Sequence, residues 1–258
     1  MTDGEYLRYD GTFPGLVRSL GPWLQRGELP SVIERAGCRQ PSLFGDDPDA
    51  AASALPGELR WVPTPDDLAC AGLPAVSMNI WRRVWVAFLS EVPGIERRIG
   101  EYLLLAAARP RDIEDLLTDS RVQQVQRCES RVRRETHAFK GLLRFRQIGD
   151  NLYLASVSPE ACILPMIAPF FAQRFADQSW IIHDRKRELA AVHENGVVTM
   201  SPRWSEKHLS LKGTEQEMQE LWKCFFKNVA VRERLNLEAQ KKHIPRRYWN
   251  DLVEEPGR

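Results

Sequence analysis

The sequence has no closely spaced pair of cysteines. Its five cysteines are scattered over 258 residues and never form a CxxC motif, whereas zinc ribbons and locally ligated iron–sulfur clusters bind metal through such pairs. We therefore expect free, mostly buried thiols and no metal site built on cysteine. The cysteines are Cys38, Cys70, Cys128, Cys162 and Cys224.

Short motifs of several catalytic classes are also absent. There is no GxGxxG dinucleotide loop, no GxxxxGK[ST] phosphate loop, no GxSxG elbow and no HExxH helix. The CxxxCxxC motif of radical S-adenosylmethionine enzymes is missing too, so the chain is not itself such an enzyme. The motifs predict no cofactor and leave open whether the chain is an enzyme.

No stretch is apolar enough to cross a membrane, because spanning a bilayer takes roughly 20 apolar residues. The N-terminal MTDGEYLRYDG also lacks the basic and apolar regions of a secretory signal. We therefore expect a cytoplasmic protein with no membrane partner. A hydrophobic content of 43% is enough for a substantial core.

The net charge of +1 conceals an asymmetry between the two halves of the chain. Residues 1–120 hold 12 Lys and Arg against 18 Asp and Glu, a balance of −6, whereas residues 121–258 hold 24 against 17, a balance of +7. Electrostatic steering depends on local potential rather than on total charge. A polyanionic partner is therefore expected to meet the second half.

Apolar periodicity predicts a mainly helical first half. A strand at 5–9 leads through the Asp10-Gly11 turn into a helix, Ser77 caps a second helix, and Pro93-Gly94 separates it from a third. Residues 41–74 are rich in Pro, Asp, Ala and Gly and are expected to form an irregular connection.

The second half is predicted to combine strands with helices. We therefore predict an α+β fold for 1–258, with an acidic helical half at 1–120 and a basic half at 121–258 that contains a small antiparallel sheet covered by helices. The expected strands are 142–148, 152–157, 180–184, 189–193 and 197–200, and the expected helices begin at Ser120, Ser158 and Glu215.

The helix from Ser120 is basic and amphipathic. Ser120 and Gln123 form a predicted capping box, and an apolar stripe is formed by Val122, Val125, Val132 and Phe139. The side chains opposite the stripe, typical of a solvated face, are Arg127, Arg131 and Arg134. Those that flank it, and are expected to border a cleft, are Arg133, His137 and Lys140.

Four stretches resemble the signature stretches of a bacterial family. They are RETHAFKGLLRF at 134–145, ILPMIAPFFAQRFADQSWIIHD at 163–184, LWKCFFKNVAVRERLN at 221–236 and HIPRRYWNDL at 243–252. The family is described as DNA-metabolism proteins whose reaction is not established. It occurs beside a radical S-adenosylmethionine enzyme of DNA repair or modification, and some members are fused to a uracil-DNA glycosylase-like domain.

The resemblance extends from YDGTFPGLV at Tyr9 to Trp249. It implies DNA, the radical S-adenosylmethionine enzyme and a uracil-DNA glycosylase-like protein as partners. The family often has His after the Ala-Pro of the second stretch, whereas this chain has Phe170. A role that depended on that histidine would fail here.

A track of basic side chains is the first candidate site, because nucleic acids are held mainly through backbone phosphates. The alternative is a solvated face with ion pairs to the acidic half; the pattern alone leaves the two even, and the resemblance favours the track. Near the C-terminus, Tyr248 follows Arg246 and Arg247. We expect an aromatic side chain of this cluster to stack on a base or to anchor the segment. The candidate nucleic-acid-binding residues are Arg133, Arg134, His137, Lys140, Arg144, Arg146, Arg185, Lys186, Arg246, Arg247 and Tyr248.

The dipeptide His183-Asp184 is the second candidate site. With His137 it would supply acid–base catalysis or, if the histidines converged, a metal site. Adjacent residues of a strand point to opposite faces, so a hydrogen-bonded structural histidine is the expected alternative and no metal is predicted.

Three functions follow from these observations. The leading hypothesis is a nucleic-acid-binding accessory protein of DNA repair or modification that acts with a radical S-adenosylmethionine enzyme. The first alternative is an enzyme that processes DNA or nucleotides with a cleft of His, Asp, Lys and Arg. The second alternative is a scaffold whose basic half binds only protein.

Overall fold

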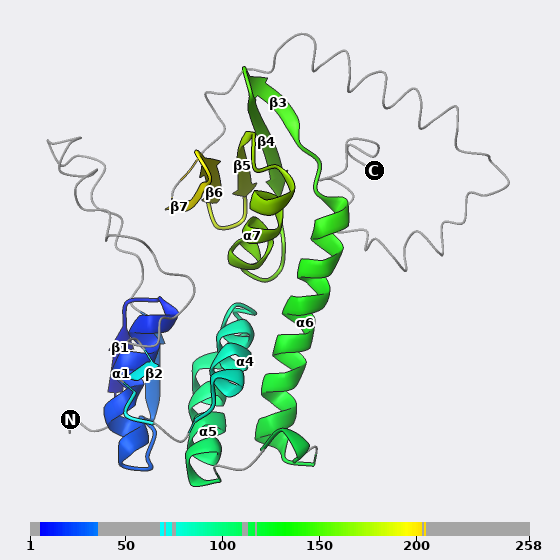
Figure 1. Ribbon diagram of the computed structural model, residues 1–258. Helices are drawn as coiled ribbons and strands as arrows, with labels where there is room; N and C mark the ends of the chain where they lie inside the picture. Colours follow the sequence, from blue (N-terminus) through cyan, green and yellow to red (C-terminus); the bar gives the residue numbers. More distant parts are fainter. Residues whose placement is uncertain are drawn as a thin grey trace, which may run out of the picture. The chain divides into compact units, whose positions relative to one another are not determined.

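A computed structural model describes residues 6–35, 68–69, 71–73, 76–109, 113–116, 118–202 and 204 (Figure 1). The chain forms two compact units, Met1–Arg133 and Arg134–Arg258. Most of the connection expected at 41–74, the helix expected at Glu215 and the terminal cluster of Arg246, Arg247 and Tyr248 lie outside the described residues.

The first unit begins with a strand, a helix and a second strand. These are β1 (Tyr6–Tyr9), α1 (Phe13–Gln25) and β2 (Val32–Arg35). The hydroxyl of Thr12 accepts the N–H of Gly15 at 3.0 Å and so caps α1. The expected strand, turn and helix are confirmed, but β2, which pairs parallel with β1, was not predicted.

Two further helices follow, α4 (Met78–Phe88) and α5 (Ile95–Ala108), and then a short 3₁₀ turn, η1 (Ile113–Asp115). Ser77 accepts the N–H of Ile80 at 3.4 Å, as the sequence predicts for a cap. Gly94 precedes α5 with a φ of 75°, a conformation that glycine adopts without strain. Both predicted helices are confirmed.

The long helix α6 (Ser120–Leu142) contains the boundary between the two units. Its predicted apolar stripe is confirmed, because Val122, Val125, Val132 and Phe139 are all at most 1% exposed. The predicted cap at Ser120 is wrong by one residue. The carboxylate of Asp119 accepts the backbone N–H of Arg121 at 2.9 Å and also binds the Arg121 guanidinium.

The second unit contains a five-stranded sheet and α7 (Leu164–Arg174), in the strand order β3-β4-β5-β6-β7. The strands are β3 (Arg146–Gly149), β4 (Leu152–Val157), β5 (Ser179–Asp184), β6 (Leu189–Glu194) and β7 (Val197–Pro202). The α+β class is confirmed, but the sheet is mixed: β4 and β5 are parallel because α7 connects them as a crossover.

The two faces of this sheet bury different residues. Alternation along the strands places Leu154 and Ile181 on one face, where they form a core cluster with Ala190. Trp180 and Ile182 lie on the other face, and α7 contacts β5, β6 and β7. The tight turn between β6 and β7 is the one predicted from Glu194-Asn195-Gly196.

Within the described ranges, no helix is both long enough and apolar enough to cross a membrane. Two of the expected free thiols, Cys128 and Cys162, are described, and both are buried and unpaired with another cysteine.

Candidate nucleic-acid interface

The part of α6 that belongs to the second unit lies along α7. The hydroxyl of Thr136 contacts the Sδ of Met166 at 3.7 Å, and one turn further the ammonium of Lys140 lies 4.9 Å from the ring centroid of Phe170. The residue numbers rise together on both helices, so the two segments run in the same direction. We call their adjoining exposed side the α6–α7 surface. Its residues are His137, Lys140, Arg144, Phe170, Arg174 and Phe175.

A buried carboxylate fixes α6 to the loop that precedes α7. Glu135 is only 7% exposed, and its two oxygens accept the backbone N–H groups of Glu160 and Ala161 at 2.7 and 2.9 Å. Charge-assisted hydrogen bonds of this kind are among the stronger ones in proteins. Glu135 therefore sets the position of α7 against the end of α6.

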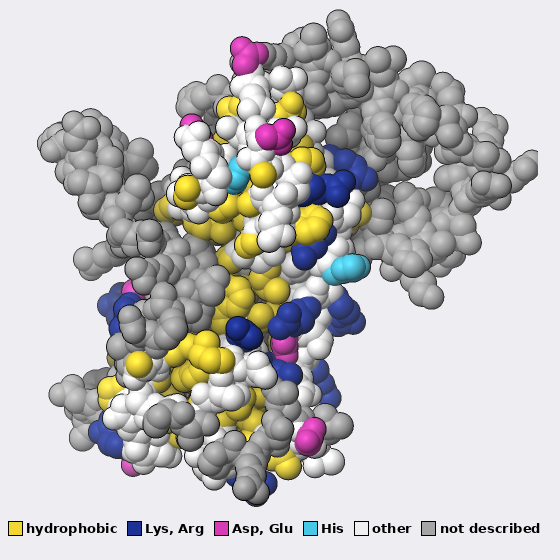
Figure 2. Space-filling model, viewed as in Figure 1, with side chains coloured by type: hydrophobic (Ala, Val, Ile, Leu, Met, Phe, Trp, Pro, Cys, Tyr) yellow, Lys and Arg dark blue, Asp and Glu magenta, His cyan; other side chains and the backbone are white. Residues whose placement is uncertain are grey.

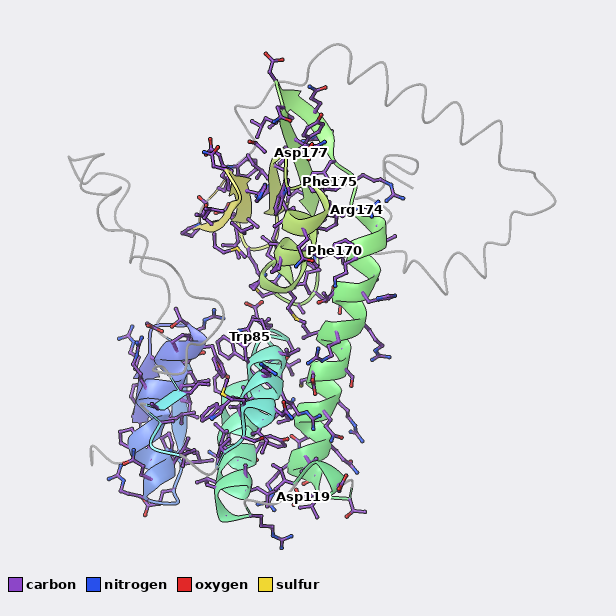
Figure 3. The ribbon with its side chains drawn as sticks, in the orientation of Figure 1. Trp85, Asp119, Phe170, Arg174, Phe175 and Asp177 are labelled. Atoms are coloured by element: carbon purple, nitrogen blue, oxygen red, sulfur yellow. The ribbon has the colours of Figure 1, made fainter. Side chains whose placement is uncertain are left out.

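Two cation–aromatic pairs lie on the α6–α7 surface. Lys140 lies over the Phe170 ring. The guanidinium of Arg174 lies 5.6 Å from the ring centroid of Phe175, and Figure 3 labels Phe170, Arg174 and Phe175. Phe170 and Phe175 are both half-buried. The ring of Phe175 is held edge-on by Phe145 at 5.5 Å, so its position is fixed by the core.

The α6–α7 surface is strongly positive. Residues 136–146 and 161–176 contain no Asp or Glu, and His137, Lys140, Arg144 and Arg174 are exposed. Figure 2 shows Lys and Arg side chains following α6 along the visible face. These two segments therefore contribute cations and no carboxylate to the local potential, and the exposed Asp177 follows the second segment directly.

Arg144 does not lie on the sheet, which corrects the expected strand at 142–148. The helix continues to Leu142, and the guanidinium of Arg144 donates to the carbonyl oxygens of Gly141 and Leu143 at 2.7 and 3.3 Å. It thus satisfies carbonyl groups at the C-terminus of α6. Arg146 is half-buried on β3, opposite Leu154.

Arg133, the first residue of the predicted stripe, is engaged in an ion pair within α6. Its guanidinium forms an ion pair of 2.7 Å with Glu129, and Arg83 of α4 binds the other oxygen of Glu129 at 2.8 Å. This three-residue cluster belongs to the first unit. Arg134, on the next position of α6, is exposed.

The predicted residues Arg185 and Lys186 lie on the turn between β5 and β6. Arg185 Nε donates to the hydroxyl of Ser158 at 3.3 Å, and Lys186 Nζ donates to the carbonyl oxygen of Glu160 at 3.3 Å. Both side chains are exposed and lie at the N-terminal end of α7. Phe170 and Arg174 lie towards its C-terminal end, so the structure separates these two groups of candidates.

His183 and Asp184 point to opposite faces of β5, as strand geometry requires. The His183 ring packs at 4.6 Å, edge to face, against Trp204. Asp184 is fully buried and binds Arg187 Nη1 at 2.7 Å and the N–H of Lys186 at 3.0 Å. Burial raises the pKa of Asp184, and Arg187 opposes this rise. His137, on α6, is exposed.

No three His, Cys, Asp or Glu side chains in the described part of the chain are grouped in a way that would hold a metal ion. The histidine and aspartate of β5 instead contribute to packing and to a buried ion pair.

Residues 93–254 match the model of a family described as a domain of unknown function, DUF4130. The chain belongs to this family. The matched region contains all of α6, the five-stranded sheet and α7, and it includes the four signature stretches in 134–252. No curated protein and no solved structure gives a match.

Three residues of the α6–α7 surface were not predicted from the sequence as binding candidates. They are Phe170, Arg174 and Phe175. Phe175 recurs at helical spacing with other apolar residues, a pattern that is typical of core positions. A signal was present: the run APFFAQRFA at 168–176 combines three aromatic rings with an arginine and has no acidic residue.

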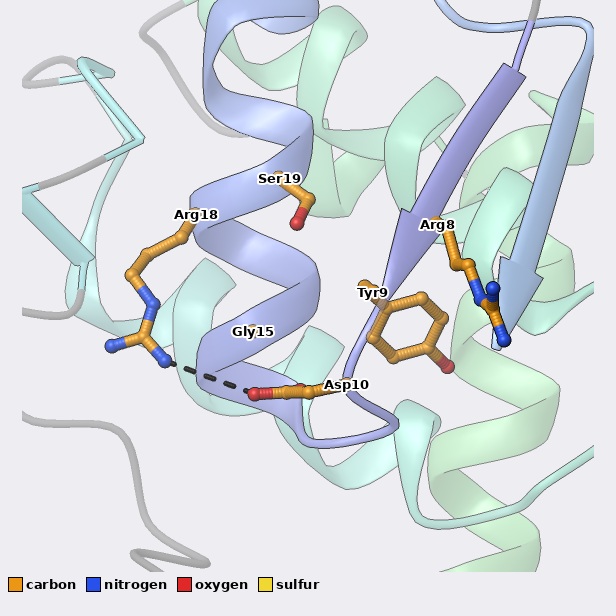
Figure 4. Close-up of a pocket in the computed structure, with 6 residues that line it drawn as sticks. All are labelled: Arg8, Tyr9, Asp10, Gly15, Arg18 and Ser19. Carbon is orange, nitrogen blue, oxygen red and sulfur yellow. Dashed lines mark ion pairs between the residues drawn. The ribbon is translucent and has the colours of Figure 1, made fainter. Parts of the chain in front are cut away.

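A separate hollow of about 430 Å³ lies outside the DUF4130 match, in the first unit (Figure 4). Three of its polar side chains, Tyr9, Asp10 and Arg18, are engaged within the protein. Asp10 accepts the N–H and the hydroxyl of Thr12 at 2.8 and 2.7 Å and pairs with Arg18 at 4.0 Å. The hydroxyl of Tyr9 donates to Glu96 at 2.8 Å, and burial together with this bond raises the pKa of Tyr9. These bonds stabilise the start of α1.

Proposed function

We propose that this chain is a nucleic-acid-binding accessory protein of DNA repair or modification, and that it works with a radical S-adenosylmethionine enzyme that carries the redox chemistry. The DNA-repair context and the partner rest on the resemblance of the four signature stretches. The binding itself rests on the α6–α7 surface.

The observation that carries the proposal is the pairing of exposed cations with aromatic rings. Lys140 lies over Phe170 and Arg174 over Phe175, within segments that contain no acidic residue. Lys and Arg neutralise phosphates and release counterions, which supplies most of the sequence-independent affinity for nucleic acid. Aromatic rings beside such cations are typical of proteins that contact bases as well as the backbone.

An accessory role is favoured over an enzymatic one by the positions of the candidate catalytic residues. His183 packs against Trp204, and Asp184 is fully buried in an ion pair with Arg187. A general acid or base must reach its substrate within hydrogen-bonding distance. A fully buried aspartate on the opposite face of the strand from the histidine does not supply that arrangement.

Fluorescence anisotropy with labelled oligonucleotides tests the binding. We expect affinity to fall steeply as salt is added, and the double variant Lys140→Gln/Arg174→Gln to lower the slope of log affinity against log salt by about 1–2. The matched control is Arg26→Gln, because Arg26 also lies over an aromatic ring, at 4.9 Å from Trp23, but in the acidic half.

Absence of binding to any oligonucleotide at low salt by the folded chain would overturn the proposal. So would equal losses in the double variant and in the control. The partner is tested separately, by size-exclusion chromatography of the chain mixed with the radical S-adenosylmethionine enzyme. A shared peak supports the partnership, and separate elution at micromolar concentrations contradicts it without affecting the DNA-binding result.

A further inference from the structure

The ammonium group of Lys140 lies over the face of the Phe170 ring. Phe170 is half-buried, and its ring meets Phe171 edge-on at 5.1 Å. Phe171 is only 3% exposed, so this contact anchors Phe170 to the core. The group that covers the ring, Lys140, is an exposed side chain on a neighbouring helix.

A cation over an aromatic face at an exposed site is held weakly, by about 0.5–1 kcal/mol. A nucleobase stacked on an aromatic side chain gains about 1–3 kcal/mol. A base can therefore replace the Lys140 ammonium on the ring at little cost. The displaced ammonium stays on its flexible stem, within reach of the phosphate next to the stacked base.

The neighbouring turn repeats the same chemistry. Arg174 follows Phe170 by four residues, so the two lie on one side of α7, about 6 Å apart along its axis. Arg174 lies against Phe175, whose ring is stacked parallel to that of Phe171 at 6.1 Å. Cations and rings thus alternate across the end of α7, with both rings anchored to the same buried phenylalanine.

We infer that the α6–α7 surface binds single-stranded nucleic acid, with an unpaired base stacked on Phe170 and the adjacent phosphates bound by Lys140 and Arg174. This inference rests on the proposed function and adds the strand preference. In a duplex both faces of each base are already stacked, so only an unpaired or extruded base can use the ring. The cations, in contrast, attract phosphates of either form.

The experiment compares three labelled ligands with the full chain: an oligothymidine of about 15 nucleotides, the same length of abasic backbone, and a duplex. We expect the oligothymidine to bind at least about 5-fold more tightly than the other two, since one stacked base contributes that much. Phe170→Leu should remove this preference by lowering the affinity for the oligothymidine to that for the abasic backbone. Phe170→Trp, which keeps a stacking ring, should retain it.

The abasic ligand tests stacking on the unaltered protein, so the result does not depend on whether a variant folds. Equal affinity for all three ligands would overturn the inference while leaving nucleic-acid binding in place. A preference for oligothymidine that survives Phe170→Leu in folded protein would also overturn it. Failure of all three ligands to bind would instead overturn the proposed function.

Discussion

Glu135 on α6 accepts the backbone N–H of Ala161 at 2.9 Å and so joins the helix to the loop before α7. Its second oxygen accepts the N–H of Glu160. Glu135→Ala would leave two donors of a part-buried loop without their acceptor, and we expect it to lower the free energy of unfolding by about 2–4 kcal/mol. Urea unfolding followed by circular dichroism measures this, with exposed His137→Ala as the control. A loss of unfolding free energy no larger than that of the control would show that the loop is stable without the Glu135 hydrogen bonds.

Asp184 and Arg187 form another buried polar contact of the second unit, with the Asp184 side chain fully buried. Removing Arg187 leaves that carboxylate uncompensated, so we expect Arg187→Met to destabilise the fold by about 3–5 kcal/mol near neutral pH. Burial raises the pKa of Asp184, and loss of Arg187 removes the main opposing influence. The folded variant therefore favours the protonated acid.

The raised pKa of Asp184 determines how the stability of Arg187→Met changes with pH. A carboxyl whose folded-state pKa lies above its unfolded value stabilises the fold at low pH, and this contribution is lost as pH rises through the folded-state pKa. The deficit of Arg187→Met relative to the natural protein should therefore shrink as pH is lowered. Urea unfolding at a series of pH values measures it, and a deficit that grows on acidification would contradict the assignment.

Asp119 at the start of α6 gives the opposite pH dependence. The hydrogen bond from the Arg121 side chain lowers the pKa of Asp119 from 3.8 to about 2. Its stabilising contribution is therefore present above 3.8 and is lost as pH falls towards about 2. Asn is an equally good cap but carries no charge. We expect the melting temperature of Asp119→Asn to lie below that of the natural protein near neutral pH, and the difference to vanish in this acid range.

The helices of the first unit and α6 were predictable because their signals are local, whereas α7 begins at Leu164 and not at the expected Ser158. Ser77 and the glycine before Ile95 mark helix starts by their own chemistry, and the buried stripe of α6 follows from spacing alone. The parallel pairing of β4 with β5 was not predictable in this way, because strand order depends on where α7 returns the chain. The start of β3 was also misjudged: the strand begins at Arg146 rather than at residue 142, which placed Arg144 wrongly.

In the candidate site, the basic residues of α6 could be predicted from the sequence, whereas the aromatic residues could not. The helical wheel singled out Lys140 because charge beside an apolar stripe is visible in sequence. Phe170 and Phe175 have the same spacing as core residues, and only packing decides which ring keeps an exposed side. Arg133 carries a local signal of its own, because Glu129 precedes it by four residues on α6 and the two form an ion pair. Only the second contact of Glu129, with Arg83 from another helix, depends on packing.

Substitution of His183 tests whether this residue of β5 is structural or catalytic. The ring is 5% exposed and packs against Trp204, so we expect His183→Ala to lower the free energy of unfolding by about 1–3 kcal/mol. DNA affinity of the folded fraction should be unchanged. Tryptophan fluorescence and anisotropy measure the two quantities. Product formation from DNA that disappears in this variant without a loss of stability would identify the chain as an enzyme.

Substitutions of Arg133 and Lys140 test whether nucleic acid binds at the α6–α7 surface or earlier on α6. Arg133 already neutralises Glu129 and would have to leave that ion pair to bind phosphate, whereas Lys140 needs only to leave the face of Phe170. We therefore expect Lys140→Gln to weaken oligonucleotide binding several-fold at low salt, and Arg133→Gln to weaken it no more than Arg127→Gln, which alters an exposed position on the same helix. Anisotropy titrations at matched ionic strength rank the three variants. If Arg133→Gln matched or exceeded Lys140→Gln, the binding surface would have to be placed earlier on α6, and the role assigned to Phe170 would lose its support.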